Sequence, residues 1–142
     1  MTLLLLNAAA VLFMTGVIWF VQLVHYPLFG KVGAEAWPTY HREHSRRTTW
    51  VVIAPMSVDL LTSLALVVIA PAGVSPVLIA GGALAAVVTW AATGLLAVPA
   101  HRDLGDGWQA GIGRRLTGAN WVRTTAWSAH SALVLAALAQ AA

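Results

Sequence analysis

Four histidines lie near the ends of long apolar runs and could together bind a transition metal. His25 and His101 each follow such a run, while His41 and His44 belong to a polar stretch between the first two runs. Imidazole is a good ligand for zinc, copper and iron, and the chain has no cysteine to offer a thiolate. His41 and His44, three residues apart, share one face of a helix. The pattern predicts a copper or iron site on His25, His44 and His101, with His41 or Glu43 completing the ligand set.

Two arginines could hold negative charge beside this site. Arg47 and Arg123 are each followed by two threonines, and a guanidinium binds a carboxylate or a haem propionate through forked hydrogen bonds. The alternative is that both side chains simply reach lipid phosphates. Tyr40 and His44 share a helical stripe with Arg47, so Tyr40 joins the candidate site. Asn120 is predicted to hydrogen-bond the substrate or a ligand.

Asp59 is the only acid well inside an apolar run. A carboxylate within the membrane is rare and is by default a functional candidate, here for binding a proton or a cation. His130 lies similarly deep in the last apolar run. An Asp59–His130 pair is possible, but helical phase places each of the two at the edge of its stripe, which does not favour a direct contact.

The composition is that of a membrane protein. Of the 142 residues, 59% are hydrophobic and only 9% are charged, whereas soluble domains carry about 25% charged residues. The net charge of +3 and the pI near 10.2 come without an aromatic-laced basic tract, so no nucleic-acid partner is predicted. In such a chain, basic residues more often set the membrane topology.

The apolar runs predict an all-α, four-helix transmembrane bundle in a single domain, 1–142. The expected helices span about 3–24, 38–70, 77–98 and 120–141, and the first run of roughly 22 residues reaches about 33 Å, enough to cross a bilayer. It lacks a basic start and a cleavage pattern, so a retained helix is expected. The second helix should extend beyond the membrane on its polar side and kink at Pro55. Small residues on the third helix permit a homo-oligomer.

All eight basic residues lie in or beside the first and third connections. By the positive-inside rule, 25–49 and 99–119 face the cytoplasm and both termini face outward. The expected location is the bacterial cytoplasmic membrane, with several spans and lipid as the surrounding partner.

Matching residues recur at one fixed spacing along the chain. His25 corresponds to His101, Arg47 to Arg123, and His44 to Asn120. Each half, 1–71 and 72–142, reads as helix, loop, helix, so the halves have the same orientation. The pattern predicts a parallel pseudo-repeat around an axis along the membrane normal.

The run of His25, Tyr26, Pro27 and Leu28, together with Tyr40, His44 and Arg47 and the stretch 120–124, resembles small four-helix bacterial membrane proteins. These are similar in layout to the anthrone-oxygenase-like membrane family, which is associated with oxidation of polycyclic aromatic metabolites. The resemblance implies an oxygenase or oxidase whose candidate site residues are His25, Tyr40, His44, Arg47, Asn120 and Arg123.

Three functional hypotheses follow. The leading one is a membrane-embedded, metal-dependent oxidoreductase acting on a lipophilic small molecule. The second is a haem b protein, with His25 and His101 as axial ligands and the arginines on the propionates. The third is a small proton- or cation-coupled carrier, or a membrane scaffold, built on Asp59.

Overall fold

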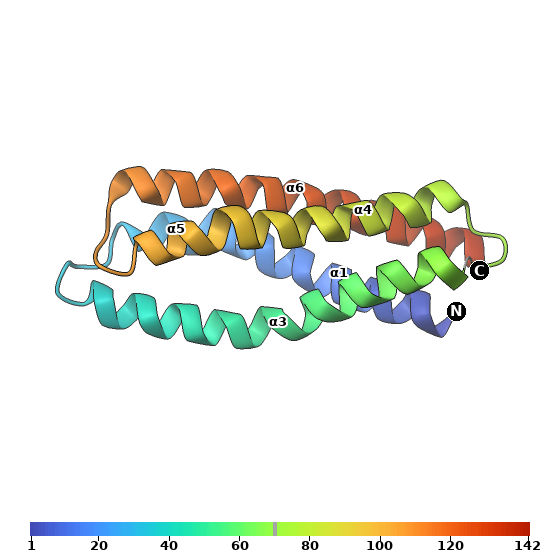
Figure 1. Ribbon diagram of the computed structural model, residues 1–142, viewed down its shortest axis with the longest axis horizontal. Helices are drawn as coiled ribbons and strands as arrows, with labels where there is room; N and C mark the ends of the chain where they lie inside the picture. Colours follow the sequence, from blue (N-terminus) through green and yellow to red (C-terminus); the bar gives the residue numbers. More distant parts are fainter. Residues whose placement is uncertain (70) are drawn as a thin grey trace.

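A computed structural model describes residues 1–69 and 71–142, which form four long antiparallel helical rods (Figure 1). Within these ranges the regular structure is entirely helical. The rods consist of α1 (Thr2–Phe20), η1 (Val21–His25) and α2 (Tyr26–Phe29); α3 (Trp37–Ile69); α4 (Pro76–Ala92), η2 (Thr93–Ala97) and α5 (Val98–Asp103); and α6 (Ala110–Ala141).

The rods form a bundle in which α1 and α4 each pack against both α3 and α6. Both termini and the short turn 71–75 lie at one end, and the longer connections 30–36 and 104–109 lie at the other (Figure 1). We call the second one the loop end. The residues predicted to form the site lie at the loop end. The first and third rods end there and α3 begins there, so the bundle brings these three rods together at the site.

Three rods are long and apolar enough to cross a membrane: Thr2–Phe29, Trp37–Ile69 and Pro76–Asp103. Large apolar side chains cover their outer faces, for example Leu61, Val68, Leu84 and Leu95. Such apolar faces suit contact with lipid. The expected all-helical architecture of four helices is therefore confirmed, and the three apolar rods suggest a membrane protein. The fourth expected span lies in α6, which is not among these three rods.

The first and third rods run further than the sequence predicted, because Pro27 and Pro99 do not end them. A proline lacks an amide hydrogen and its ring crowds the preceding turn. Here the residue before each proline bonds one position further back: Tyr26 N–H donates to the carbonyl of Val21, and Val98 N–H to that of Thr93. The wider π turn accommodates the ring and lets the helix continue.

The fourth rod also differs from its expected bounds, whereas the second rod lies close to its own. α6 begins at Ala110, ten residues before the predicted start, and takes in the segment expected to be loop. α3 continues through Pro55, and Figure 1 shows it changing direction along its length. A bend without a break is the usual result of proline inside a helix.

Aromatic side chains close the loop end. Phe29 and Trp37 are fully buried there with Leu104, and the Trp37 indole N–H donates to the Leu104 carbonyl at 2.7 Å. The Trp108 ring covers Gly113, where an added Cβ would lie 2.2 Å from the ring. This aromatic cap ties both long connections to the bundle and forms the outer wall of the site.

Candidate functional site

The four predicted histidines converge at the loop end; together they are called the histidine cluster (His25, His41, His44, His101). His25 Nε2 lies 2.8 Å from His44 Nδ1, and His41 Nε2 lies 3.2 Å from His101 Nδ1. The rings of His44 and His101 stack with their centroids 5.4 Å apart, which joins the two pairs. Residues 76 positions apart in the chain thus share one site, contributed by three rods.

Local backbone geometry helps to aim these side chains. His25 is the last residue of η1, and His101 lies in α5, directly after η2. A π turn holds one more residue than an α turn and so changes the face on which later residues lie. The two π turns therefore set the direction from which His25 and His101 meet the histidines of α3.

Hydroxyl groups and an aromatic ring surround the cluster. The Tyr26 hydroxyl lies 3.0 Å from His101 Nε2, and the Thr48 hydroxyl lies 3.1 Å from His44 Nδ1. Phe29 meets His25 and His44 edge-on, with centroids 5.0 Å away in each case. A neutral imidazole has one donor and one acceptor nitrogen, so these contacts suit uncharged rings bonded in pairs.

As the side chains stand, the described residues contain no group of three or more His, Asp or Glu arranged to hold a metal ion. The reason is visible in the contacts: the ring nitrogens point at one another in pairs instead of toward a common centre. Two nitrogens on a tetrahedral metal with bonds of about 2.05 Å would be about 3.3 Å apart. The two paired separations, 2.8 and 3.2 Å, lie near that value, and each pair brings together the nitrogens of two histidines.

Glu43 does not join the histidines. Its carboxylate accepts hydrogen bonds from Arg46 Nη2 at 2.8 Å and from Arg47 Nε at 3.2 Å on the surface of α3. Tyr40 lies half-buried with its ring parallel to that of His44, at 6.5 Å. Of these two predicted residues, only Tyr40 contributes to the wall of the cluster.

The two predicted arginines occupy different environments. The Arg47 side chain is 76% exposed, whereas Arg123 is only 6% exposed. Arg123 Nη1 donates to Asn120 Oδ1 at 3.3 Å, and Asn120 Nδ2 donates in turn to Gln22 Oε1 at 2.8 Å. Asn120, predicted to contact a ligand, is fully buried and orients Arg123.

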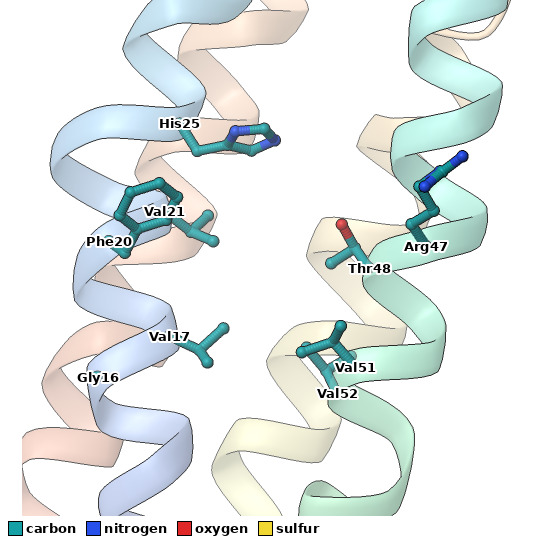
Figure 2. A pocket seen from close by; sticks show the side chains of 9 residues that line it. All are labelled: Gly16, Val17, Phe20, Val21, His25, Arg47, Thr48, Val51 and Val52. Carbon is teal, nitrogen blue, oxygen red and sulfur yellow. The ribbon is translucent and has the colours of Figure 1, made fainter.

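Two cavities flank the cluster. The larger, about 450 Å³, lies between the first rod and α3 and is lined mostly by apolar side chains, with His25, Arg47 and Thr48 as its polar lining residues (Figure 2). The smaller, about 250 Å³, is lined by Thr48, His101 and Arg123. Thr48 borders both, so the histidine cluster lies between two spaces that suit an apolar molecule.

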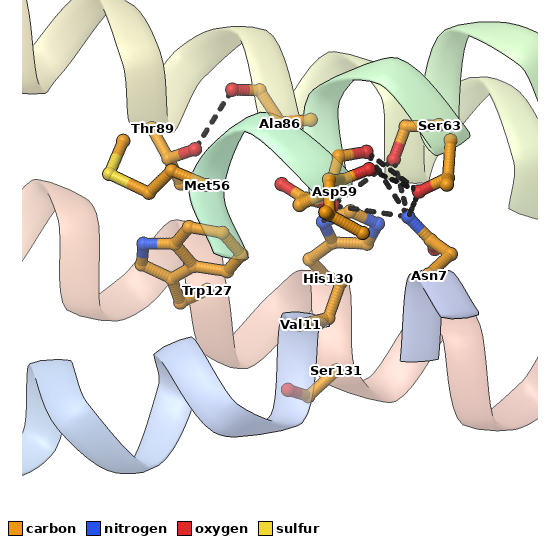
Figure 3. A network of polar contacts seen from close by, with 12 residues as sticks. Asn7, Val11, Met56, Asp59, Ser63, Ala86, Thr89, Trp127, His130 and Ser131 are labelled. Carbon is orange, nitrogen blue, oxygen red and sulfur yellow. Dashed lines mark hydrogen bonds and ion pairs between the residues drawn. The ribbon is translucent and has the colours of Figure 1, made fainter. Parts of the chain in front are cut away.

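A second polar group, the Asp59 network (Asn7, Asp59, Thr62, Ser63, His130), lies in the apolar middle of the bundle (Figure 3). Asn7 Nδ2 donates to the hydroxyls of Thr62 and Ser63, both at 2.9 Å, and to Asp59 Oδ1 at 3.2 Å. Asp59 lies ten residues from the end of α3, or about 15 Å, near the midplane of a hydrocarbon layer of about 30 Å.

Asp59 and His130 do meet, contrary to the expectation from helical phase. His130 Nδ1 lies 3.4 Å from Asp59 Oδ1, and both side chains are completely enclosed. Asp59 Oδ2 and His130 Nδ1 have no hydrogen-bond partner among the described residues. Gly82 makes the contact possible, because a Cβ there would come within 3.0 Å of the His130 ring. The helical phase of Asp59 on α3 and of His130 on α6 could not show that Gly82 on α4 leaves room for the two side chains to meet.

The sequence reasoning missed two residues of the site, Tyr26 and Gln22. Tyr26 contacts His101, and Gln22 holds Asn120. A signal existed for each: Tyr26 is adjacent to His25, and Gln22 is a polar residue one turn earlier in an apolar run.

Comparison of the chain with protein-family models, with curated proteins and with solved structures finds no match.

Proposed function

We propose that the protein is a membrane-embedded, metal-dependent oxidoreductase that acts on a lipophilic small molecule. One observation carries the proposal: four imidazoles from three rods lie in mutual contact beside cavities with largely apolar linings. Histidine is the usual ligand of copper and iron where no thiolate is available. An apolar molecule dissolved in the bilayer could reach the cluster from the side.

In this proposal His25, His44 and His101 bind a copper or iron ion. To hold an ion, each of these three imidazoles would turn one unprotonated ring nitrogen toward it, which would break the present ring–ring hydrogen bonds. His41 is a better fourth ligand than Glu43, because His41 already contacts His101 whereas Glu43 is engaged by two arginines. The bound metal would supply the redox chemistry, and the residues of this chain would bind and orient the substrate.

The proposal places the loop end at the cytoplasmic face of a bacterial inner membrane. The basic residues gather at this end, which the positive-inside rule assigns to the cytoplasm. His44 lies 25 residues from the end of α3, or about 38 Å. That exceeds a hydrocarbon thickness of about 30 Å, so the cluster would lie in the interface when the other end of α3 lies at the opposite one.

The pseudo-repeat and the family resemblance belong to the same proposal. A π turn precedes a proline in both the first and the third rod, which supports two related halves, 1–71 and 72–142. Similarity to the anthrone-oxygenase-like layout favours oxidation of an aromatic compound among lipophilic substrates.

Metal analysis of the purified protein tests the proposal. We expect near-stoichiometric copper or iron in the wild type, little in His44→Ala, and a wild-type amount in His130→Gln, which changes a histidine outside the cluster. Absence of a retained transition metal in the wild type would overturn it.

The optical spectrum of the same sample tests the haem alternative. If His25 and His101 held a haem, both would have to move away from His44, whose ring centroid lies 4.6 Å from that of His25 and 5.4 Å from that of His101. A colourless protein would exclude haem b.

A proton- or cation-coupled carrier is the second candidate, and the enclosed Asp59–His130 contact favours it. A carboxyl and an imidazole near the midplane can share one proton. Flux assays in vesicles would compare the wild type with Asp59→Asn, using the exposed Asp103→Asn as the matched control. Equal flux for all three would exclude this role for Asp59.

A further inference from the structure

Arg123 is a buried cation without a carboxylate partner. It is 6% exposed, and the ion pairs among the described residues involve Arg46, Arg47, Arg115 and His130 instead. One of its five N–H groups donates to Asn120, and the Tyr26 hydroxyl also lies against the guanidinium. Its buried Nε has no hydrogen-bond partner in the described part of the chain. Burying a charge without an opposite charge is costly, so this guanidinium is suited to a ligand that supplies one.

The guanidinium lines the cavity of about 250 Å³ between α3 and the third rod. The other polar groups on this wall are His101 and the hydroxyls of five residues, and the apolar part is Val52, Ala97 and Val98. The five hydroxyl residues are Tyr26, Ser45, Thr48, Thr49 and Thr93. Thr49 and Val98 are exposed on the outer surface. The cavity therefore offers a cation and hydroxyl donors inside and an opening toward the lipid-facing side.

The position of Arg123 is fixed before any ligand arrives. Asn120 is completely buried and holds Arg123 through its Oδ1, while Gln22 on the first rod holds Asn120. A guanidinium that is already oriented loses little freedom on binding, which favours forked recognition of a planar anion.

We propose that this cavity binds the carboxylate of a lipophilic acid, with the carboxylate against Arg123 and the apolar body extending toward the bilayer. One guanidinium balances one carboxylate, and the two match in a forked geometry. A phospholipid phosphodiester also carries one charge, but it has two bulky substituents, which a cavity of about 250 Å³ does not accommodate.

This inference deepens the proposed function by naming the class of substrate. The role of the lipophilic acid as a substrate rests on the proposed metal-dependent function. Binding itself needs no metal. Calorimetry on metal-free protein in a neutral detergent therefore tests the cavity independently, while metal analysis tests the cluster.

The probes are dodecanoate, dodecanol, acetate and phosphatidylglycerol. We expect dodecanoate to bind and to raise the melting temperature of the wild type, and dodecanol and acetate to bind at least tenfold more weakly. Arg123→Gln should weaken dodecanoate binding by roughly tenfold or more, as loss of a charged hydrogen bond does. Arg123→Lys keeps the charge but loses the fork, so it should show an intermediate loss.

Arg114→Gln is the matched control, since Arg114 is an exposed arginine on the same helix, and it should bind dodecanoate like the wild type. Equal binding of dodecanol and dodecanoate by the wild type would overturn the proposal without recourse to any variant. Displacement of dodecanoate by phosphatidylglycerol at similar concentration would also overturn it, by assigning the site to a lipid phosphate.

Discussion

The histidine cluster and the Asp59 network are both polar groups inside an apolar bundle, but they differ in access. In the cluster, His25 lines the cavity of about 450 Å³ and His101 lines the one of about 250 Å³. Asp59 is 0% exposed, and the space beside His130 amounts to about 10 Å³, at the limit for a single water molecule. Similar residue types therefore face very different surroundings.

This difference teaches how each group should respond to change. Side chains beside open cavities can rotate and exchange partners, so their loss should affect binding more than folding. Enclosed side chains bond mainly to one another and to nearby backbone, so removing one leaves its partners with fewer hydrogen bonds. The cluster is thus expected to behave as a binding site, and the network as a mainly structural element.

The largest expected effect is on metal retention at the cluster. His44→Ala should reduce bound metal from near one ion per chain to background, because His44 joins the two histidine pairs. Its melting temperature without metal should stay near that of the wild type. Metal analysis checks the bound metal and a thermal melt checks the melting temperature. Full metal retention by the variant would contradict the view that the histidine cluster is a binding site and the Asp59 network is not.

The next effect is on the stability of the network. Asp59→Ala should lower the free energy of unfolding by about 1–3 kcal/mol, because it leaves Asn7 and His130 buried without this partner. Asp59→Asn, which keeps the shape and an acceptor oxygen, should cost less. Unfolding in mixed detergent measures both, and metal content should remain unchanged; metal loss in Asp59→Ala would show that the regions are coupled.

A third change tests what holds the cluster in place. Gly113→Ala puts a Cβ 2.2 Å from the Trp108 ring, and overpacking of this kind typically costs about 1–3 kcal/mol. The shift should spread through the aromatic cap to Phe29 and so weaken metal binding by the cluster. Gly118→Ala, where a Cβ would meet nothing within 4 Å, is the matched control. Identical metal affinity for both variants would contradict this role for the cap.

The smallest effect is expected at Arg47, whose side chain is 76% exposed and paired on the surface with Glu43. Surface ion pairs contribute little to stability. Arg47→Gln should leave the melting temperature and the metal content unchanged within error. A marked loss of metal would assign Arg47 to the site and restore its equivalence with Arg123.

The candidate site was predictable only in part. The convergence of His25, His41, His44 and His101 followed from their places at helix ends, because hydropathy fixes where a helix leaves the membrane. Their contacts did not, since the π turns before Pro27 and Pro99 change the helical phase that a regular wheel assumes. The early start of α6 was missed because the glycines of 105–118 read as a loop when tertiary packing is ignored.

By itself, the sequence determined an all-helical bundle with an apolar exterior and the end at which the histidines gather, because hydropathy and helix length are local properties. Only the tertiary structure decided that Arg123 is buried while Arg47 is exposed, and that Asp59 meets His130 beside Gly82. Those outcomes depend on how the rods rotate and pack against one another. That arrangement is set by the fit of side chains from several rods at once, which no single stretch of sequence contains.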